Sequence, residues 1–473
     1  MRRRTLISAA AATVFSALSP AVSALEADRQ QAENVFDVVV VGSGLAGLSA
    51  AVSAYESGAR SVLILEKGPL IGGHSVFASG SMTFIDSKRQ LEGVSDTVDD
   101  FVEDARIVGG DINEPMVRMI GENSADAIDW LESHGVKFGQ IPFRAFGGMK
   151  ARCISSSGNF GAKQYVTALF EAARRSGIPT RLLEPVVDLQ LRESYWEVTT
   201  QPSGKSPAKL YAKSVVLATG GFTANVSMRM QYDPRLDSTL STTANPQGHF
   251  YDGATGDGHK MAFKLGAAAV KMQNMIVMPY WNGRLLDYAG GEIYVDASGS
   301  RFVDETSSHL TISEKILALP DRAFWVITDS KTHKGANFGT KLAMGGIHKS
   351  ESIGAMAAAM GIPPGALQKT IDEFNAAVRS GNDPKFGRTL FLQTMDTPPF
   401  YWGKETLFVH GTLGGVKTDL DCRVLTEDNE PIPGLFAAGE IVGGVWGKDR
   451  MGGCALTSCV VQGRRAGSAA AKQ

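Results

Sequence analysis

A short stretch near the start of the chain has a pattern that can hold a diphosphate group. Residues 42–47 are GSGLAG, which fits G-x-G-x-x-G, and the acidic Glu66 follows nineteen residues after Gly47. In this pattern the first glycine permits a tight turn, the second lets backbone approach a pyrophosphate, and the third lets a helix pack closely on a strand. Glu66 is spaced to accept hydrogen bonds from ribose hydroxyls. The motif therefore predicts dinucleotide binding.

The segments on both sides of the motif support this interpretation. Phe36–Val41 is a continuous apolar, β-branched run, which is typical of a strand buried on both faces of a parallel sheet. The residues after the glycines predict a helix, and a second apolar strand ends at Glu66. The N-terminus of that helix would present unpaired N–H groups and the positive end of its dipole to the phosphates.

Later segments favour FAD over NAD. An apolar strand at Ser214–Ala218 ends in the residues TGGF, and a third apolar segment, Ile432–Glu440, continues into IVGG. In α/β folds, ligands bind beyond the carboxyl ends of parallel strands. Glu440 can hold ribityl hydroxyls, and the last helix, which residues 450–456 open, can stabilise negative charge on a reduced flavin. Since segments from both ends of the chain would close on one extended ligand, we predict FAD.

Eight stretches, taken in order, carry a family resemblance: VVVVGSGLAGLSAA, EKGPLIGGHSVFASGSM, VVLATGGF, TGDGHKMA, GSRFVDETSSH, VHGTLGGVKTD, GLFAAGEIVGGVWG and KDRMGGCAL. Together they resemble the flavoprotein subunits of the fumarate reductase and succinate dehydrogenase family, especially the soluble, exported flavocytochrome c branch with its fumarate and urocanate reductases. They cover nearly the whole chain from Phe36 onward. The multihaem domain that this branch often carries is not among them. We therefore expect a separate c-type cytochrome or flavin carrier to supply electrons.

The resemblance implies an α/β fold in which a discontinuous Rossmann-like FAD-binding domain carries an inserted α+β cap domain. The expected boundaries are 25–281 and 409–473 for the FAD-binding domain and 282–408 for the cap. Together with the glycine-rich loops, the resemblance implies a set of residues that contact FAD. They are Gly42, Ser43, Gly44, Ala46, Gly47, Glu66, Lys67, Gly73, His74, Ser75, Gly80, Ser81, Val187, Thr219, Gly220, Asp257, Glu440, Ala455 and Leu456.

The resemblance also implies a reaction and two of its residues. In the family, hydride passes from N5 of reduced flavin to one alkene carbon while a cap arginine protonates the neighbouring carbon. Arg450 in KDRMGG matches the arginine that grips a substrate carboxylate, a role suited to a planar, permanently charged fork. His410 in VHGTLGG matches a substrate-contacting histidine. We expect both residues in the catalytic site.

Three other family positions differ in this sequence. At the proton-donating arginine of the family's N-E-x-x-x-R pattern, residues 304–309 are DETSSH, so His309 occupies the donor position. The family's H-P-T motif corresponds to Met278-Pro279-Tyr280. The T-E-x-x-R proton relay falls in a shorter stretch near 284–291, where Tyr288 is the one evident hydroxyl. These departures argue against fumarate as the substrate.

The departures share a physical consequence for the substrate pocket. One carboxylate clamp, Arg450, is kept, while the opposite wall exchanges a polar anchor for Met278 amid Tyr280, Trp281, Tyr288 and Trp446. Burying a second carboxylate without a partner would cost several kcal/mol, so an apolar or aromatic group fits that wall better. We predict a monocarboxylate with an apolar or aromatic tail.

The proton donor and the direction of the reaction stay open. His309 is a competent acid near neutrality, but it can also be a solvent-exposed cap residue. In that alternative Tyr288 or a bound water donates the proton, or the protein acts as a dehydrogenase that desaturates an acid or ketone. A flavin protein of another class, which transfers electrons or binds without turning over a small molecule, is a further alternative.

Composition and the N-terminus bound the remaining possibilities. The 473 residues carry 47 Lys and Arg against 49 Asp and Glu, which gives no general argument for nucleic-acid or anionic-membrane binding. Four cysteines without a C-x-x-C pair exclude covalent c-type haem, and no zinc spacing predicts a metal site.

Residues 1–24 are typical of a signal peptide, with three arginines resembling a twin-arginine signal. No later segment is apolar enough to span a bilayer. We expect a periplasmic protein without stable membrane insertion.

The pattern of apolar residues predicts further elements around these sites. Residues 85–155 are expected to form a helical insertion in the FAD-binding domain, and a small β-meander is expected to precede the strand at Ser214. The predicted elements are a helix at Gln164–Arg175, strands at Thr180–Leu191, Trp196–Thr200 and Phe324–Thr328, and cap helices at Ser352–Met360 and Pro364–Ser380.

Overall fold

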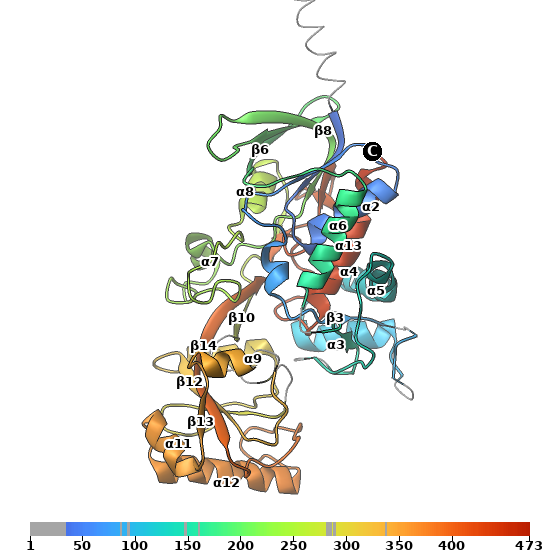
Figure 1. The fold of residues 1–473 in the computed structure, drawn as a ribbon. Helices are drawn as coiled ribbons and strands as arrows, with labels where there is room; N and C mark the ends of the chain where they lie inside the picture. The colour runs from blue at the N-terminus through green and yellow to red at the C-terminus, as the bar shows by residue number, and fades with distance from the viewer. Residues whose placement is uncertain are drawn as a thin grey trace, which may run out of the picture.

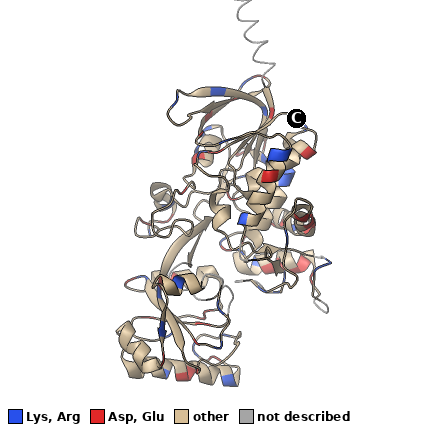
Figure 2. Ribbon diagram, in the orientation of Figure 1, with Lys and Arg blue, Asp and Glu red and all other residues tan. Residues whose placement is uncertain are grey.

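The structure is a computed structural model that describes residues 35–85, 88–91, 95–145, 149–158, 161–280, 286, 290–335 and 338–473. The predicted signal segment at 1–24, Trp281 and Tyr288 lie outside these residues. Within the described ranges, no helix is both long enough and apolar enough to cross a membrane. Basic and acidic residues alternate along the outer helices rather than forming one large patch of a single sign (Figure 2).

A large mixed sheet forms the centre of the upper domain in Figure 1. Its parallel strands, in spatial order, are β17 (Pro431–Ala437), β8 (Ala208–Leu217), β1 (Val35–Val41), β2 (Val62–Leu65) and β5 (Thr180–Arg181). The edge strand β16 (Arg423–Leu425) is antiparallel. Three central valines of β1, Val38 to Val40, are fully buried, which confirms the predicted strand with two covered faces. The strands β6 (Val186–Leu191) and β7 (Trp196–Thr200) form the predicted meander with β8.

Two helices that bring the motifs together pack side by side against this sheet (Figure 1). They are α2 (Leu45–Glu56), which follows the first glycine motif, and α13 (Cys454–Ala470), which ends the chain. Glycines let them approach closely: a Cβ built on Gly467 would lie 2.1 Å from the carbonyl oxygen of Ala50, and one on Gly463 would lie 2.5 Å from that of Ala46. Because of this close packing, segments from the two ends of the chain share one ligand face.

The helical insertion is confirmed. It contains α3 (Val98–Gly109), α4 (Glu114–Glu122) and α5 (Ser124–Ser133), and α6 (Lys163–Arg175) follows it. Short elements complete the domain: η1 (Gly73–Phe77), β3 (Met82–Thr83), β4 (Cys153–Ile154), α7 (Val226–Tyr232), α8 (Asp257–Lys264), β9 (Ala269–Val270) and β15 (Gly415–Val416).

A second body forms the lower part of Figure 1, and two strands connect it to the large domain. The chain leaves through β10 (Met275–Pro279) and returns through β14 (Phe400–Thr412), and these two strands pair with each other. The remaining elements are β11 (Ile293–Val295), α9 (His309–Leu317), β12 (Ala323–Thr328), α10 (Phe338–Ala343), β13 (His348–Ser350), α11 (Ile353–Met360) and α12 (Pro364–Ser380). The predicted cap boundary at 408 falls inside β14, whose earlier residues pair with β12 and whose later residues pair with β10.

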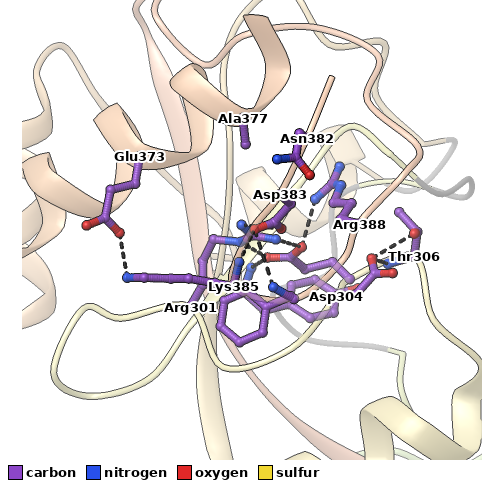
Figure 3. A network of polar contacts seen from close by, with 12 residues as sticks. Arg301, Asp304, Thr306, Glu373, Ala377, Asn382, Asp383, Lys385 and Arg388 are labelled. Atoms are coloured by element: carbon purple, nitrogen blue, oxygen red, sulfur yellow. Dashed lines mark hydrogen bonds and ion pairs between the residues drawn. The ribbon is translucent and has the colours of Figure 1, made fainter. Parts of the chain in front are cut away.

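A network of buried ion pairs connects separate segments of the cap (Figure 3). Arg301 grips Glu305 through two hydrogen bonds of 2.7 Å and pairs with Asp383 at 2.9 Å, while Arg388 reaches Glu305 at 2.8 Å. Arg388 also donates to the carbonyl oxygens of Gly290 and Glu292. All four charged side chains are nearly inaccessible to solvent, so each depends on its partners. The network therefore holds the loop that leads into α9.

Candidate active site

The glycine motif forms a turn that leaves no room for a side chain at its first and third glycines. Gly42 has a φ of +106°, and a Cβ there would lie 2.3 Å from the carbonyl oxygen of Ala218. A Cβ on Gly47 would lie 2.0 Å from the carbonyl oxygen of Gly42. Gly44 is the N-cap residue directly before α2, and a Cβ there would meet nothing closer than 3.8 Å. The backbone of the motif therefore stays open toward a ligand at the N-terminus of α2.

The acidic Glu66 closes the same turn. Its Oε2 accepts hydrogen bonds from the backbone N–H of Ser43 at 3.0 Å and from the Ser43 hydroxyl at 2.7 Å. Its Oε1 accepts from the N–H of Gly68 at 2.7 Å. A carboxylate oxygen has more than one acceptor position, so ribose hydroxyls can bind in addition. Glu66 is thus oriented before a nucleotide arrives.

A first cavity of about 890 Å³ lies over the carboxyl ends of β1, β2 and β8. The predicted residues that line it are Gly42, Gly44, Ala46, Glu66, Lys67, Gly73, His74, Ser75, Thr219, Gly220, Asp257 and Glu440. The Lys67 ammonium pairs with Asp257 at 2.5 Å. Burial raises the pKa of Asp257, but the hydrogen bond and charge of Lys67 outweigh it and lower the pKa below its ordinary value.

Other predicted contacts do not line this cavity. Ser43 is buried behind the turn, and Gly47 packs against it. Gly80 and Ser81 lie outside the lining set. The Val187 side chain is 50% exposed, while its neighbour Val186 lines the cavity. The two side chains lie on opposite faces of β6, so a contact of Val187 with FAD stays a prediction for its backbone.

A second cavity of about 980 Å³ continues from the first and shares His74, Ser75, Glu440 and Cys459 with it. The predicted residues that line it are Tyr280, His410, Glu440, Trp446, Arg450, Ala455 and Leu456. Met278 is buried in β10 and is not among the lining residues. The predicted opening of the last helix by 450–456 is confirmed, because α13 begins at Cys454.

Arg450, His410 and Thr243 form a chain of polar contacts in the second cavity. Arg450 Nη2 lies 3.4 Å from His410 Nε2, and His410 Nδ1 lies 3.0 Å from the Thr243 hydroxyl. A guanidinium can only donate, so Nε2 of His410 accepts and Nδ1 carries the proton toward Thr243. His410 also lies against the ring of Tyr280, with 5.8 Å between centroids.

His309 lies at the first position of α9, next to the segment that carries Arg450. Its Nδ1 is 3.4 Å from Oδ1 of Asp449, and its side chain is 8% exposed. The alternative of a solvent-exposed cap residue therefore does not fit the structure. His309 is not among the residues that line the second cavity, and it approaches the site through Asp449, the residue before Arg450.

His74 lies where the two cavities meet. His74 Nε2 is 2.6 Å from Oδ1 of Asp252, and Thr242 donates to the other carboxylate oxygen at 2.5 Å. Burial lowers the pKa of His74, but the hydrogen bond and charge of Asp252 outweigh it and raise the pKa above its ordinary value. Burial raises the pKa of Asp252, yet His74 and Thr242 bring it to about 2. The Asp252 carboxylate thus favours the charged form of a histidine that lines both cavities.

Known proteins with similar sequences indicate the cofactor and the family of this chain. Residues 37–456 match the family model described as an FAD binding domain. The probable fumarate reductase of Shewanella frigidimarina is 34% identical over 92% of this chain and 74% of its own length. The urocanate reductase of Eggerthella lenta has the same identity and coverage. The chain belongs to the fumarate reductase-like FAD flavoproteins.

Further matches extend over the full fold. The acrylate reductase flavoprotein subunit of Shewanella woodyi is 30% identical over 98% of this flavoprotein and 97% of its own length. The open conformation of a flavocytochrome c3 fumarate reductase superposes with a TM-score of 0.74 at 31% identity, covering 95% of this chain and 81% of the other. A 3-ketosteroid-delta4-(5alpha)-dehydrogenase from Rhodococcus jostii reaches the same TM-score at 25% identity, covering 93% and 97%. The predicted fold and cofactor are thereby confirmed.

The residues of this flavoprotein fit FAD on structural grounds as well. The glycine cradle at Gly42 and Gly47 excludes side chains that would block a pyrophosphate. Glu66, from the N-terminal part of the chain, and Glu440, from the C-terminal part, both line the first cavity. Ala455 and Leu456 line the second cavity. Two connected cavities suit a long ligand with a nucleotide at one end and a ring system at the other.

A substitution at Gly47 tests this cradle. Gly47→Ala places a methyl group 2.0 Å from the Gly42 carbonyl oxygen, so the turn must open. Overpacking of this kind costs about 1–3 kcal/mol, and we expect FAD affinity to fall about 10- to 100-fold. Flavin absorbance titrated into apoprotein measures it. Gly354→Ala is the matched control, since a Cβ there meets nothing within 4 Å. Equal affinity in the two variants would contradict the cradle.

The buried His259 is expected to make the flavoprotein sensitive to acid. His259 in α8 is fully buried, packs edge-on against Phe222, and has no hydrogen-bond partner for either ring nitrogen among the described residues. Burial lowers the pKa of His259 to about 4, against about 6.5 in an unfolded chain. Between these values the unfolded chain binds one more proton, so stability falls as the pH drops from about 6.5 to 4.

The variant His259→Leu removes the contribution of this histidine to the pH dependence of stability. Between pH 7 and pH 4.5, the free energy of unfolding of the wild type should fall by about 2–3 kcal/mol more than that of the variant. Urea denaturation followed by tryptophan fluorescence measures the difference. His249→Leu serves as the control, because His249 is exposed and should lose stability in parallel with the wild type. Parallel curves for His259→Leu and the wild type would refute the assignment.

Three polar residues of the site had no place in the sequence analysis. Thr243 and Asp252 lie in the loop between α7 and α8, where no motif marks them. Asp449 directly precedes Arg450 within the matched block KDRMGG. Its position beside Arg450, the arginine predicted to bind a carboxylate, was the available signal, but its contact with His309 depends on the fold.

Proposed function

We propose that this flavoprotein reduces the C=C bond of an α,β-unsaturated acid that carries one carboxylate and an apolar or aromatic tail. The observation that carries the proposal is the charge of the second cavity. Among the described lining residues, Arg450 is the one arginine or lysine, and no carboxylate within the described part of the chain pairs with its guanidinium. A cationic fork without an acidic partner in a pocket favours an anionic ligand.

The rest of the second cavity favours an apolar tail. Its wall includes Phe77, Tyr280, Leu413, Val445 and Trp446. Trp446 is 5% exposed and packs edge-on against Phe101, so it is not free to leave the pocket. A second substrate carboxylate placed against this wall would lose its hydration without gaining a cation. A short diacid therefore fits less well than a monocarboxylate.

Each residue has a role in this proposal. Arg450 binds the carboxylate through its guanidinium, and His410, held by Thr243, contacts the substrate beside it. FAD, when bound and reduced, supplies a hydride to one alkene carbon. His309 gives a proton to the neighbouring carbon, so one hydride and one proton convert the C=C bond into a saturated CH–CH bond. Tyr280 packs against His410 and lines the same cavity.

The relatives support the chemistry at a coarser level. Their names include a fumarate reductase, a urocanate reductase and an acrylate reductase subunit, which all act on unsaturated carboxylates. Acrylate has one carboxylate, and urocanate joins one acrylate carboxylate to an aromatic ring. Both compounds have the charge that a single arginine clamp favours.

The proposal extends to location and electron supply. The arginine-rich segment at 1–24 supports export by the twin-arginine route to the periplasm. A separate c-type cytochrome or flavin carrier would then deliver electrons, as part of an anaerobic respiratory chain. Release of the mature chain into a periplasmic fraction, and its loss when Arg3 and Arg4 are both changed to lysine, would support this route.

A dye-coupled assay tests the reductase function. Purified holoprotein with dithionite-reduced methyl viologen should bleach the dye when given acrylate, crotonate, cinnamate or urocanate. Arg450→Met, with its FAD content measured, is the matched control. No turnover across the panel by FAD-loaded wild type would overturn the proposal.

The reverse reaction is the second candidate. The likeness to the 3-ketosteroid dehydrogenase from Rhodococcus jostii supports it, since that fold also serves desaturation. Turnover of a saturated acid or ketone with an artificial acceptor, together with no turnover of reduced dye and enoates, would favour a dehydrogenase. A flavin protein without small-molecule turnover would instead accept electrons normally while Arg450→Met changed no activity.

A further inference from the structure

Asp449 joins the cap to the segment that carries the carboxylate-binding arginine. Its Oδ1 accepts from the backbone N–H of Arg450 at 2.8 Å and lies 3.4 Å from His309 Nδ1. Its Oδ2 accepts from the backbone N–H of Leu310 at 3.1 Å. The Asp449 side chain is 1% exposed. One buried carboxylate thus contacts both domains where the proposed proton donor meets the proposed carboxylate clamp.

The FAD-binding domain holds Asp449 rigidly. The turn at 446–449 packs on the end of α3, where a Cβ on Gly109 would lie 1.8 Å from the Trp446 carbonyl oxygen and 2.8 Å from that of Asp449. The Lys448 N–H donates to the Gly109 carbonyl oxygen at 2.8 Å. The turn has no space to shift toward α3, so the carboxylate keeps its direction toward the cap.

The cap holds His309 with similar rigidity. Ser308 caps α9 through a 3.1 Å bond from the Thr311 N–H, and the Ser313 hydroxyl donates to the carbonyl oxygen of Val277 in β10. Leu310 presents one of the unpaired N–H groups of the first helical turn, which a carboxylate satisfies well. Asp449 therefore completes the N-terminus of α9 from the other domain.

We propose that Asp449 is a positioning residue that fixes the ring of His309, with the proton on Nδ1, and thereby directs proton delivery through Nε2. This proposal rests on the proposed function, in which His309 protonates the substrate. Burial raises the pKa of Asp449, but His309 and the N–H groups of Leu310 and Arg450 outweigh it and lower the pKa, so the group is a carboxylate and can only accept. A carboxylate at Nδ1 selects the Nδ1–H tautomer and stabilises the imidazolium.

The tautomer of His309 is measurable without any turnover. In FAD-loaded wild type with ¹⁵N-labelled histidine, the signals missing from His309→Gln identify the His309 ring. In its neutral form the wild-type ring should show a protonated Nδ1 and an unprotonated Nε2. In Asp449→Asn the population of that tautomer should fall, because an amide can also donate to Nδ1 and then selects the Nε2–H form. A wild-type ring protonated on Nε2 would overturn the proposal even if Asp449→Asn fails to fold.

Kinetics separate positioning from simple support of the fold. With reduced dye and an active enoate, Asp449→Asn should lower kcat by about 10²- to 10⁴-fold, the range for loss of a correctly oriented acid, while KM changes less than about threefold. Asp449→Glu should restore part of the loss. Asp304→Asn is the matched control, because its carboxylate binds Thr306 in the same cap loop. An unchanged kcat in FAD-loaded Asp449→Asn would overturn the proposal.

The tautomer measurement and the kinetic measurement together distinguish failure of the positioning role from failure of the proposed function. If wild type turns over no enoate but the His309 ring carries its proton on Nδ1 and loses that preference in Asp449→Asn, then the reductase function is wrong and the contact between the residues is right. If wild type is an active reductase and the His309 signals are identical in wild type and Asp449→Asn, then the positioning role is wrong and the function stands.

Discussion

Replacing Arg450 with methionine should lower kcat/KM for an active enoate by about 100- to 4,000-fold while FAD content stays unchanged. A buried carboxylate that loses its charged partner is destabilised by about 3–5 kcal/mol, and each 1.4 kcal/mol corresponds to a factor of ten. Methionine keeps much of the side-chain volume, so the effect reports charge and hydrogen bonding. Steady-state assays with reduced dye measure it, and flavin absorbance measures the FAD content.

Two further variants define the origin of that loss. Arg450→Lys keeps the charge but loses the planar fork, so its activity should lie between those of the wild type and Arg450→Met. Arg464→Met makes the same change on the outer face of α13, where Arg464 pairs with Asp126, and should leave activity unchanged. If Arg450→Met retains more than about a tenth of wild-type kcat/KM, the guanidinium does not hold the carboxylate, given the energies above.

Replacing His309 with glutamine should lower kcat by about 10²- to 10⁴-fold, because the variant keeps a polar side chain but loses the acid. In the proposed function Arg450 and His410 bind the substrate, so KM should change less than about threefold when the proton-delivery step alone is impaired. The flavin should still be reduced by the dye at the wild-type rate. Stopped-flow absorbance separates these two half-reactions.

A cap histidine outside the site provides the control for His309. His333→Gln changes an exposed cap residue and should leave both half-reactions unchanged. If His309→Gln oxidises reduced flavin with an enoate as fast as wild type, another group donates the proton. Tyr288, the donor in the alternative considered from the sequence, would then be the residue to replace.

The local parts of the fold were predictable because they follow from contiguous residues. The run of valines before Gly42 defines β1, and α12 begins at Pro364 and ends at Ser380 as predicted. At Gly42 and Gly47 the fold has no room for a Cβ, and the glycines in the sequence motif predict this directly. Arg450 and His410, predicted through the family resemblance, indeed come together in one cavity, with 3.4 Å between Nη2 and Nε2.

The remaining parts depended on contacts between distant segments. His309 and Asp449 are 140 positions apart, and the contact between them requires the cap and the FAD-binding domain to be assembled. His74 and Asp252 are 178 positions apart. At β6, a shift of one residue changes the face of the strand, so Val186 rather than Val187 lines the cavity. Sequence patterns carry no direct signal for such relations.

The ratio of kcat/KM for cinnamate to that for fumarate, measured with reduced methyl viologen, tests the central claim most directly. Both compounds place a carboxylate on a trans alkene, but fumarate adds a second carboxylate where cinnamate has an aromatic ring. Arg450 is the one arginine or lysine among the described lining residues, and much of the remaining lining is apolar. We therefore predict that cinnamate is preferred by about 10²-fold or more, as expected from the cost of burying an unpaired charge. Equal values, or a preference for fumarate, would contradict the account.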